Sequence, residues 1–166
     1  DLWEGACDAA RTSAVLFMII IAAGLFGYML TILRIPNQLV ELVATYDVSK
    51  YQFLVAAMVL IFLLGLVLES ISIILITTPV LLPVLDQLGI DKVWYGVLLT
   101  INLELALISP PVGMNLIVIK SITKAPLAEI DKAAIPYILM LILAIAILIA
   151  FPEIALWLPQ AMRYGG

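Results

Sequence analysis

The chain has 166 residues, of which 65% are hydrophobic and 12% are charged. A soluble domain of this length cannot bury so much apolar surface, because its ratio of surface to volume is too high. The composition therefore predicts an integral membrane protein and excludes an intrinsically disordered chain. The net charge of −4 argues against a nucleic-acid-binding protein, which requires a basic surface.

Residue types that common catalytic and metal sites require are missing. The sequence has no histidine, which excludes a His-ligated metal and Ser-His catalysis, and its one cysteine, Cys7, excludes an internal disulfide and a Cys-ligated zinc. No segment resembles a P-loop, so we expect no ATP hydrolysis by this chain. We expect neither an enzyme nor a resident cofactor.

The first apolar run lies between Arg11 and Arg34. At 1.5 Å per residue it matches a hydrocarbon core of roughly 30 Å, which predicts a transmembrane helix over residues 12–33. Gly24 and Gly27 within it could let another helix approach closely. The chain begins with Asp1 and acidic neighbours rather than a basic leader, so we expect a segment of a longer polypeptide.

Residues 35–50 have polar side chains on one side and apolar side chains on the other, which predicts a short interfacial helix or a plain connector. Residues 51–85 form two short apolar runs that meet at a polar tip beginning with Glu69. Pro79 and Pro83 interrupt the second run. The two runs predict a re-entrant hairpin, and the competing interpretation is one full span with a surface turn at Glu69.

Residues 93–120 are long enough to cross a membrane but hold Ser109, Pro110, Pro111 and Gly113 near their middle. The two prolines remove two N–H donors and disfavour the α conformation in the residue before each of them. The pattern predicts two half-helices joined by unwound chain at membrane depth.

The last apolar segment predicts a transmembrane helix over residues 133–158, with Pro136 in its first turn. Trp157 and Tyr164 stand where interfacial aromatic residues are expected. The predicted fold class is therefore an all-α integral membrane protein. Counting positive charges leaves its orientation open, and the cluster over residues 120–132 weakly favours a cytoplasmic location for that loop.

A broken membrane helix frees backbone carbonyls, which bind small cations such as Na⁺, and exposes a half-helix N-terminus, which favours an anion. We expect Na⁺ ligands at Ser109, Gly113 and Asn115. The alternative is a structural proline kink with incidental polar residues. The full set of candidate ion- and substrate-binding residues is Ser70, Ser72, Asn102, Ser109, Pro110, Gly113, Met114 and Asn115.

Glu69 and Glu104 are the acids deepest in apolar sequence. An ionised carboxylate in lipid is costly, so each should face protein or water. A carboxylate would repel an anionic substrate, which favours a structural or cation-binding role. Glu104 could also carry a proton. Glu69 would lie at the membrane interface if residues 51–85 did not form a re-entrant hairpin.

Six motifs together resemble the large membrane subunit of tripartite ATP-independent periplasmic (TRAP) transporters, along essentially the whole chain. They are residues 68–70 (Leu-Glu-Ser), 78–83 (Thr-Pro-Val-Leu-Leu-Pro), 89–91 (Gly-Ile-Asp), 102–104 (Asn-Leu-Glu), 109–116 (Ser-Pro-Pro-Val-Gly-Met-Asn-Leu) and 156–159 (Leu-Trp-Leu-Pro). Glu69, Ser109 and Ala106 stand where the family often has Asp, Thr and Gly.

The resemblance implies that the chain is the second half of an inverted-repeat subunit in a bacterial inner membrane, and that its transport domain moves like an elevator. Residues 51–85 would be a hairpin that opens toward the periplasm, and residues 120–132 would be cytoplasmic. The family imports carboxylate-bearing solutes, such as dicarboxylates or sialic acids, with a Na⁺ gradient. Its partners would be a small membrane (Q) subunit, a periplasmic solute-binding (P) protein, the other half of the large (M) subunit and the lipid bilayer.

Two other functions remain possible from the residues alone. A divalent-anion/sodium symporter has similar hairpins and broken helices but works without a binding protein. A membrane scaffold or assembly subunit would have no ion site at residues 109–115. The sequence does not identify the substrate.

Overall fold

The structure is a computed structural model that describes residues 2–110 and 113–163. Over these residues the chain forms helices and no strands, which confirms the predicted all-α class. The helices are α1 (Leu2–Ile32), α2 (Ile35–Thr45), α3 (Lys50–Gly65), α4 (Ser70–Gln87), α5 (Lys92–Leu107), α6 (Met114–Thr123), α7 (Leu127–Ala150) and α8 (Glu153–Arg163).

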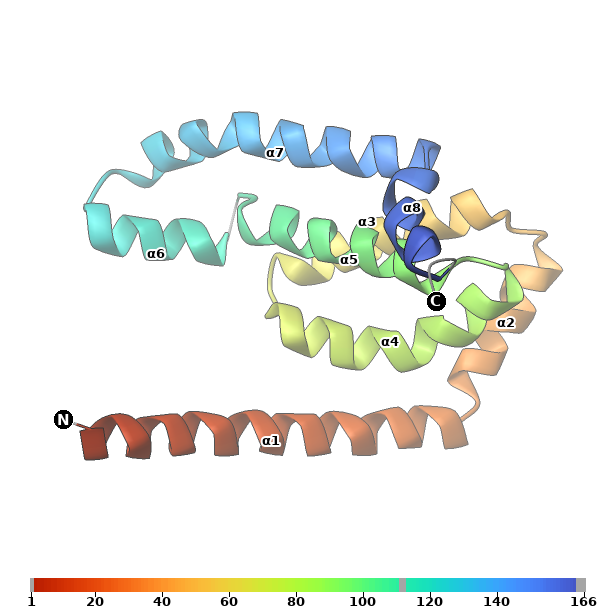
Figure 1. Cartoon of the computed structure of the whole chain (residues 1–166), viewed down its shortest axis with the longest axis horizontal. Coiled ribbons are helices and arrows are strands. Elements are labelled where there is room, and N and C mark those ends of the chain that lie inside the picture. Colours follow the sequence, from red (N-terminus) through yellow and green to blue (C-terminus); the bar gives the residue numbers. More distant parts are fainter. Residues whose placement is uncertain (1, 111–112, 164–166) are drawn as a thin grey trace.

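Most of the helices run along the long axis of the molecule, whereas α2 and α8 lie at one end of it (Figure 1). Helix α1 packs against α4, α3 packs against α5, and α5 packs against α7. Among the described residues, three helices are long and apolar enough to cross a membrane, namely α1, α4 and α7. The apolar side chains of α1 and α7 are mostly exposed in the chain by itself, as expected of surfaces that face lipid or other membrane helices, whereas those of α4 are mostly buried or half-buried.

Helix α1 starts earlier than the predicted span over residues 12–33 and ends at Ile32. Arg34 adopts a left-handed conformation with φ of 54°, which turns the chain into α2. Gly27 lies against α4, where an added Cβ would be 3.2 Å from Pro79 Cγ, whereas a Cβ at Gly24 would meet nothing within 4 Å. Close approach is therefore confirmed at Gly27 and absent at Gly24.

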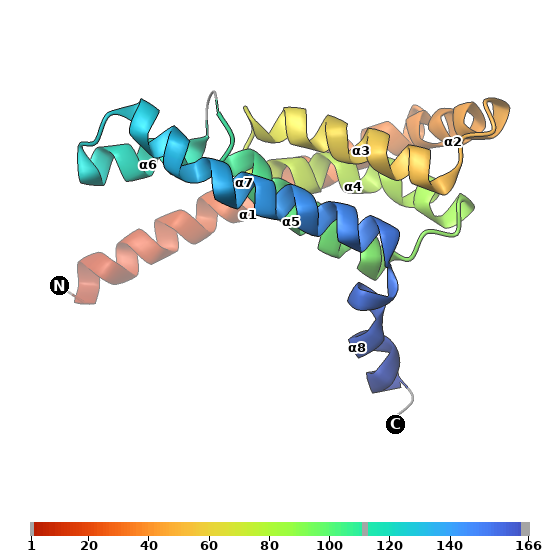
Figure 2. The ribbon, with the colours of Figure 1, turned by 90° about the horizontal axis from the view of Figure 1, so that it is seen from above.

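Helices α3 and α4 form an antiparallel pair (Figure 1). A capping box between Ser49 and Gln52 begins α3, and residues 66–69 turn the chain into α4. The start of α3 and the end of α4 lie at the same end of the molecule, and the turn lies beside the break between α5 and α6 (Figures 1 and 2). Re-entry of this pair into the membrane stays a prediction.

The prolines in the second apolar run do not interrupt it. Helix α4 continues through both Pro79 and Pro83. Each proline removes one backbone hydrogen bond and crowds the carbonyl four residues earlier, which favours a bend but does not require the helix to end. Packing of Gly27 against Pro79 accommodates one of the two rings.

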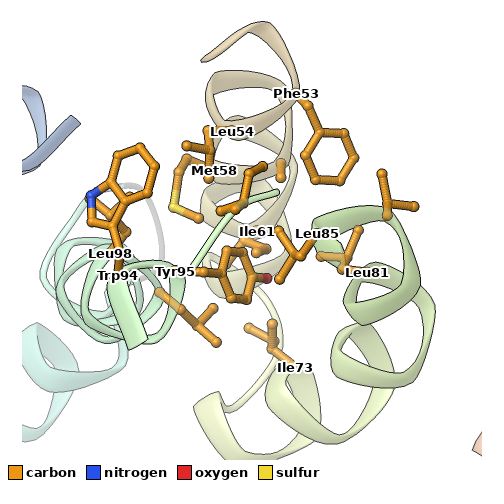
Figure 3. Packing of buried hydrophobic residues seen from close by; sticks show 14 of the residues in the cluster. Phe53, Leu54, Met58, Ile61, Ile73, Leu81, Leu85, Trp94, Tyr95 and Leu98 are labelled. Atoms are coloured by element: carbon orange, nitrogen blue, oxygen red, sulfur yellow. The ribbon is translucent and has the colours of Figure 1, made fainter. Parts of the chain in front are cut away.

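The core lies between α3, α4 and α5 (Figure 3). Its fully buried members are Leu54, Ile61, Ile73, Val84, Leu85 and Leu98. Trp94 joins this core to α7, because its Nε1 donates a hydrogen bond of 2.8 Å to the Leu148 carbonyl. The core therefore fixes the antiparallel pair against α5, the helix that leads to the break.

The end of the chain differs from the prediction of one helix over residues 133–158. Helix α7 spans Leu127–Ala150, so Pro136 lies inside it rather than in its first turn. Phe151 leaves the helical conformation, with φ of −126° and ψ of 75°, because Pro152 disfavours the α region for the residue before it. Helix α8 then turns away from α7 (Figure 2). Tyr164, expected at the interface, lies outside the described residues.

Candidate functional site

The break predicted between two half-helices is present. Helix α5 ends at Leu107 and α6 begins at Met114. The Ile108 N–H bonds the Glu104 carbonyl at 3.3 Å, and the Ser109 N–H bonds the Ala106 carbonyl at 3.2 Å, so the last turn tightens before it stops. Pro110 follows as an exposed residue, and Pro111 lies outside the described residues.

Gly113 is the residue before the first turn of α6 and marks the end of the break. Its φ of 41° lies in the left-handed region that favours glycine. A Cβ added there would lie 2.9 Å from Leu116 Cδ1 and 3.2 Å from the Ser109 carbonyl oxygen. Gly113 and the Ser109 carbonyl are therefore neighbours, and both conformation and space require glycine at this position.

Two polar side chains are buried before the break, one in α5 and one just after its end. Asn102 is 2% exposed and donates through Nδ2 to the Met58 carbonyl on α3, at 2.9 Å. Ser109 is 4% exposed and donates through Oγ to the Leu105 carbonyl, at 2.6 Å. A hydroxyl that donates keeps acceptor lone pairs, so Ser109 Oγ can still ligate a cation. Their spacing of seven residues agrees with burial on the same side of the helix.

The structure separates Asn115 from these buried groups. Asn115 is exposed on the first turn of α6, while the next residue, Leu116, is buried. Of the three expected Na⁺ ligands, Ser109 and Gly113 lie together and the Asn115 side chain faces outward. Met114 begins α6, and its side chain lies outside the described residues.

The turn between α3 and α4 lies against the last turn of α5. A Cβ added to Gly65, the last residue of α3, would be 2.5 Å from Ala106 Cβ and 3.7 Å from Ile73 Cδ1. Small residues on both helices thus let the two backbones approach closely. This contact brings residues 66–69 to the break. No pattern in the sequence predicted this contact.

Three of the candidate polar residues lie at this turn. Ser72 Oγ donates to Glu69 Oε2 at 3.4 Å, and Glu69 precedes the first residue of α4 without accepting a capping hydrogen bond through its side chain. Ser70 begins α4 and is half-buried, whereas Glu69 is exposed.

Glu104 points away from Asn102 and Ser109. It is exposed and lines a cavity of 650 Å³ between α5, α6 and α7, which Glu129 and Tyr137 also line. Nowhere in residues 2–110 or 113–163 do three or more His, Cys, Asp or Glu side chains gather as a metal site would require. An ion site at the break would therefore be built from carbonyl, hydroxyl and amide oxygens.

The break between α5 and α6 thus exposes two helix ends, which ion-coupled carriers use to bind ions and substrates. The carbonyl end of α5 carries partial negative charge, and the N–H end of α6 carries partial positive charge. Apolar helices with a helix interrupted beside a helical hairpin are typical of one repeat of a secondary transporter.

The chain belongs to the DctM component family of tripartite ATP-independent periplasmic transporters. The model of this family matches residues 1–154, which confirms the resemblance found in the sequence.

Three relatives show how much of a family member the chain covers. The C4-dicarboxylate TRAP transporter large permease proteins of Pseudomonas aeruginosa and Rhodobacter capsulatus are 33% and 35% identical over 92% and 93% of this chain. The sialic acid TRAP transporter large permease protein of Vibrio cholerae is 28% identical over 95% of it. The match covers 36%, 35% and 37% of these proteins, so the chain spans about a third of their length. All three are named as permeases, which confirms the expectation that the chain is not an enzyme.

Proposed function

We propose that this chain is part of a sodium-driven secondary transporter that imports carboxylate-bearing organic anions delivered by a periplasmic binding protein. Family membership supports transport, and the names of two relatives support dicarboxylates while that of a third supports sialic acid. The observation that carries the proposal is the position of the α3–α4 turn against the break between α5 and α6.

Na⁺ would bind at the break. The Ser109 carbonyl lies beside Gly113, and Ser109 Oγ keeps acceptor capacity. Oxygen ligands of this kind suit a hard cation. Because Asn115 faces outward here, its oxygen would complete the site only after a rotation of the first turn of α6 or against another part of the complete permease.

The substrate carboxylate would be attracted by the N-terminus of α6 and by the hydroxyl groups of Ser70 and Ser72 at the start of α4. Glu69 and Glu104 would then stay away from the anion. Glu69 would hold the turn through Ser72, and Glu104 would interact with a cation or with a basic group of the complete permease.

The pair α3–α4 would re-enter the membrane rather than cross it twice. Helix α3 has 16 residues, which gives about 24 Å at 1.5 Å per residue, short of a core of roughly 30 Å. The pair would open toward the periplasm and move with α5 and α6 in an elevator-like step, because Gly65 and Ala106 leave little space between α3 and α5. The loop after α6 would then be cytoplasmic.

The remaining part of the large (M) subunit, a small membrane (Q) subunit and a periplasmic solute-binding (P) protein would complete the transporter in a bacterial inner membrane. Uptake of labelled C4-dicarboxylate and sialic acid by proteoliposomes tests this proposal. The complete permease should transport only with an inward Na⁺ gradient and added binding protein. Uptake without the binding protein would indicate a stand-alone symporter, and absence of uptake of any carboxylate would indicate an assembly subunit.

A further inference from the structure

Helix α8 is the part of the chain that the proposed transport function does not use. It follows α7 after the non-helical Phe151 and leaves the direction of α7 (Figure 2). Its 11 residues are too few to cross a hydrocarbon core.

The inner side of α8 packs on the protein. Ala155 and Leu156 contact the buried cluster of α3, α4 and α5. Leu156, Pro159 and Gln160 also line a cavity of 500 Å³ that they share with the loop before α5. The orientation of α8 about its own axis is therefore fixed by contacts within the chain.

The outer side of α8 is apolar and exposed. Ile154, Trp157, Leu158 and Met162 are each more than half exposed, and Trp157 is 70% exposed. Their spacing of three and four residues places them on one face of the helix. Glu153 and Gln160, seven residues apart, form a polar line beside that face.

Charged residues lie next to the inner side of α8. Asp86 in the last turn of α4 and Lys92 at the start of α5 form an exposed ion pair of 2.9 Å there. On its other flank, α7 is an apolar helix long enough to cross a membrane and ends just before α8 begins. Helix α8 thus lies between the end of a candidate membrane span and an exposed ion pair.

We propose that the outer face of α8, formed by Ile154, Trp157, Leu158 and Met162, binds the boundary between lipid headgroups and acyl chains, with the helix lying in the membrane plane. The occupant is lipid because α8 directly follows α7, an apolar helix long enough to cross a membrane, and large apolar side chains of both helices are exposed. A tryptophan beside a polar line suits this boundary, where one side of the helix is apolar and the other is wet.

This anchor would set the depth of the broken helix. Helix α8 contacts α5, and Trp94 near the start of α5 bonds α7. A helix held at the headgroup level therefore fixes how deep α5 begins, without touching the break itself.

Site-directed spin labelling tests the proposal with the complete permease, freed of its other cysteines, in vesicles of phosphatidylethanolamine and phosphatidylglycerol. In a Cys7→Ser background, single cysteines replace Leu158 on the outer face, Gln160 on the polar line and Leu143 in α7. All three positions are exposed, so the labels displace no core side chain, and circular dichroism confirms the helical content of each variant.

Collisions of the nitroxide with oxygen and with a water-soluble nickel chelate report its depth. We expect a shallow depth in lipid at Leu158, a greater depth at Leu143, and free access of the chelate at Gln160. A label at Leu158 as deep as that at Leu143 would mean that α8 continues the span. Access of the chelate to Leu158 equal to that at Gln160 would leave the face in water, and shielding from both reagents would mean a protein partner. Each of these three results overturns the proposal.

Discussion

Replacing Gly65 with alanine should separate α3 from α5 at the level of the break. The added Cβ would lie 2.5 Å from Ala106 Cβ, well inside the contact distance of two carbon atoms. Both atoms are attached directly to helix backbones, so neither can rotate away. Overpacking of this kind costs about 1–3 kcal/mol, and we expect that loss in the free energy of unfolding of the Gly65→Ala variant.

The same geometry gives a double-mutant cycle. Ala106→Gly removes the atom with which the new Cβ collides, so the pair Gly65→Ala and Ala106→Gly should recover much of the lost stability, apart from about 1 kcal/mol for a glycine inside a helix. Gly96→Ala is the matched control, because a Cβ at Gly96 meets nothing within 4 Å. It should be neutral or slightly stabilising.

Chemical unfolding of the purified chain in detergent, followed by circular dichroism, measures these differences. A Gly65→Ala variant as stable as the Gly96→Ala control would refute the close contact between α3 and α5. A double variant no more stable than Gly65→Ala would also refute it, because the collision would then lie elsewhere.

Three further predictions follow from single positions. Tyr95→Phe should raise the free energy of unfolding by about 1 kcal/mol, because the buried hydroxyl has no hydrogen-bond partner in the described part of the chain. Equal or lower stability of this variant would mean that the hydroxyl is paired. Gly113→Val should abolish uptake by the complete permease at normal protein levels, since a β-branched residue is strained at φ of 41°, and wild-type uptake would contradict this. Single cysteines at Lys50 and Gln87, in a Cys7→Ser background, should react with an impermeant reagent from the same side of the membrane, and labelling from opposite sides would exclude re-entry.

Local backbone stereochemistry explains why some helix ends could be predicted from the sequence and others could not. The break was predictable because Pro110, Pro111 and Gly113 restrict their own backbone and that of their neighbours. The same rule applied to Phe151-Pro152 would have ended α7 at Ala150, but the apolar composition beyond it favoured one long helix. Pro79 and Pro83 show the opposite case, because α4 continues through both of them.

The site was harder to predict, because helical periodicity holds only within one helix. It is consistent with the burial of both Asn102 in α5 and Ser109 just after it, seven residues apart. It could not relate Ser109 to Asn115, since α5 ends at Leu107 and the phase of α6, which begins at Met114, is set by the left-handed Gly113. The contact between Gly65 and Ala106 depends on the arrangement of two helices in space, which no pattern within one segment encodes.

The dependence of uptake on Na⁺ concentration tests most directly the claim that the break binds the coupling ion. Ser109→Ala removes the hydroxyl of a residue whose carbonyl lies beside Gly113. Thr100→Ala is the matched control, because both hydroxyls bond the carbonyl four residues earlier on α5 and only Ser109 lies at the break. Asn115→Leu tests whether that amide completes the site.

Loss of one oxygen ligand should cost on the order of 1–3 kcal/mol, which corresponds to a roughly 5- to 150-fold higher Na⁺ concentration for half-maximal uptake. We predict this shift for Ser109→Ala, a shift in the same direction for Asn115→Leu, and none for Thr100→Ala. An unchanged Na⁺ dependence in both Ser109→Ala and Asn115→Leu, at normal protein levels, would contradict a sodium site at the break.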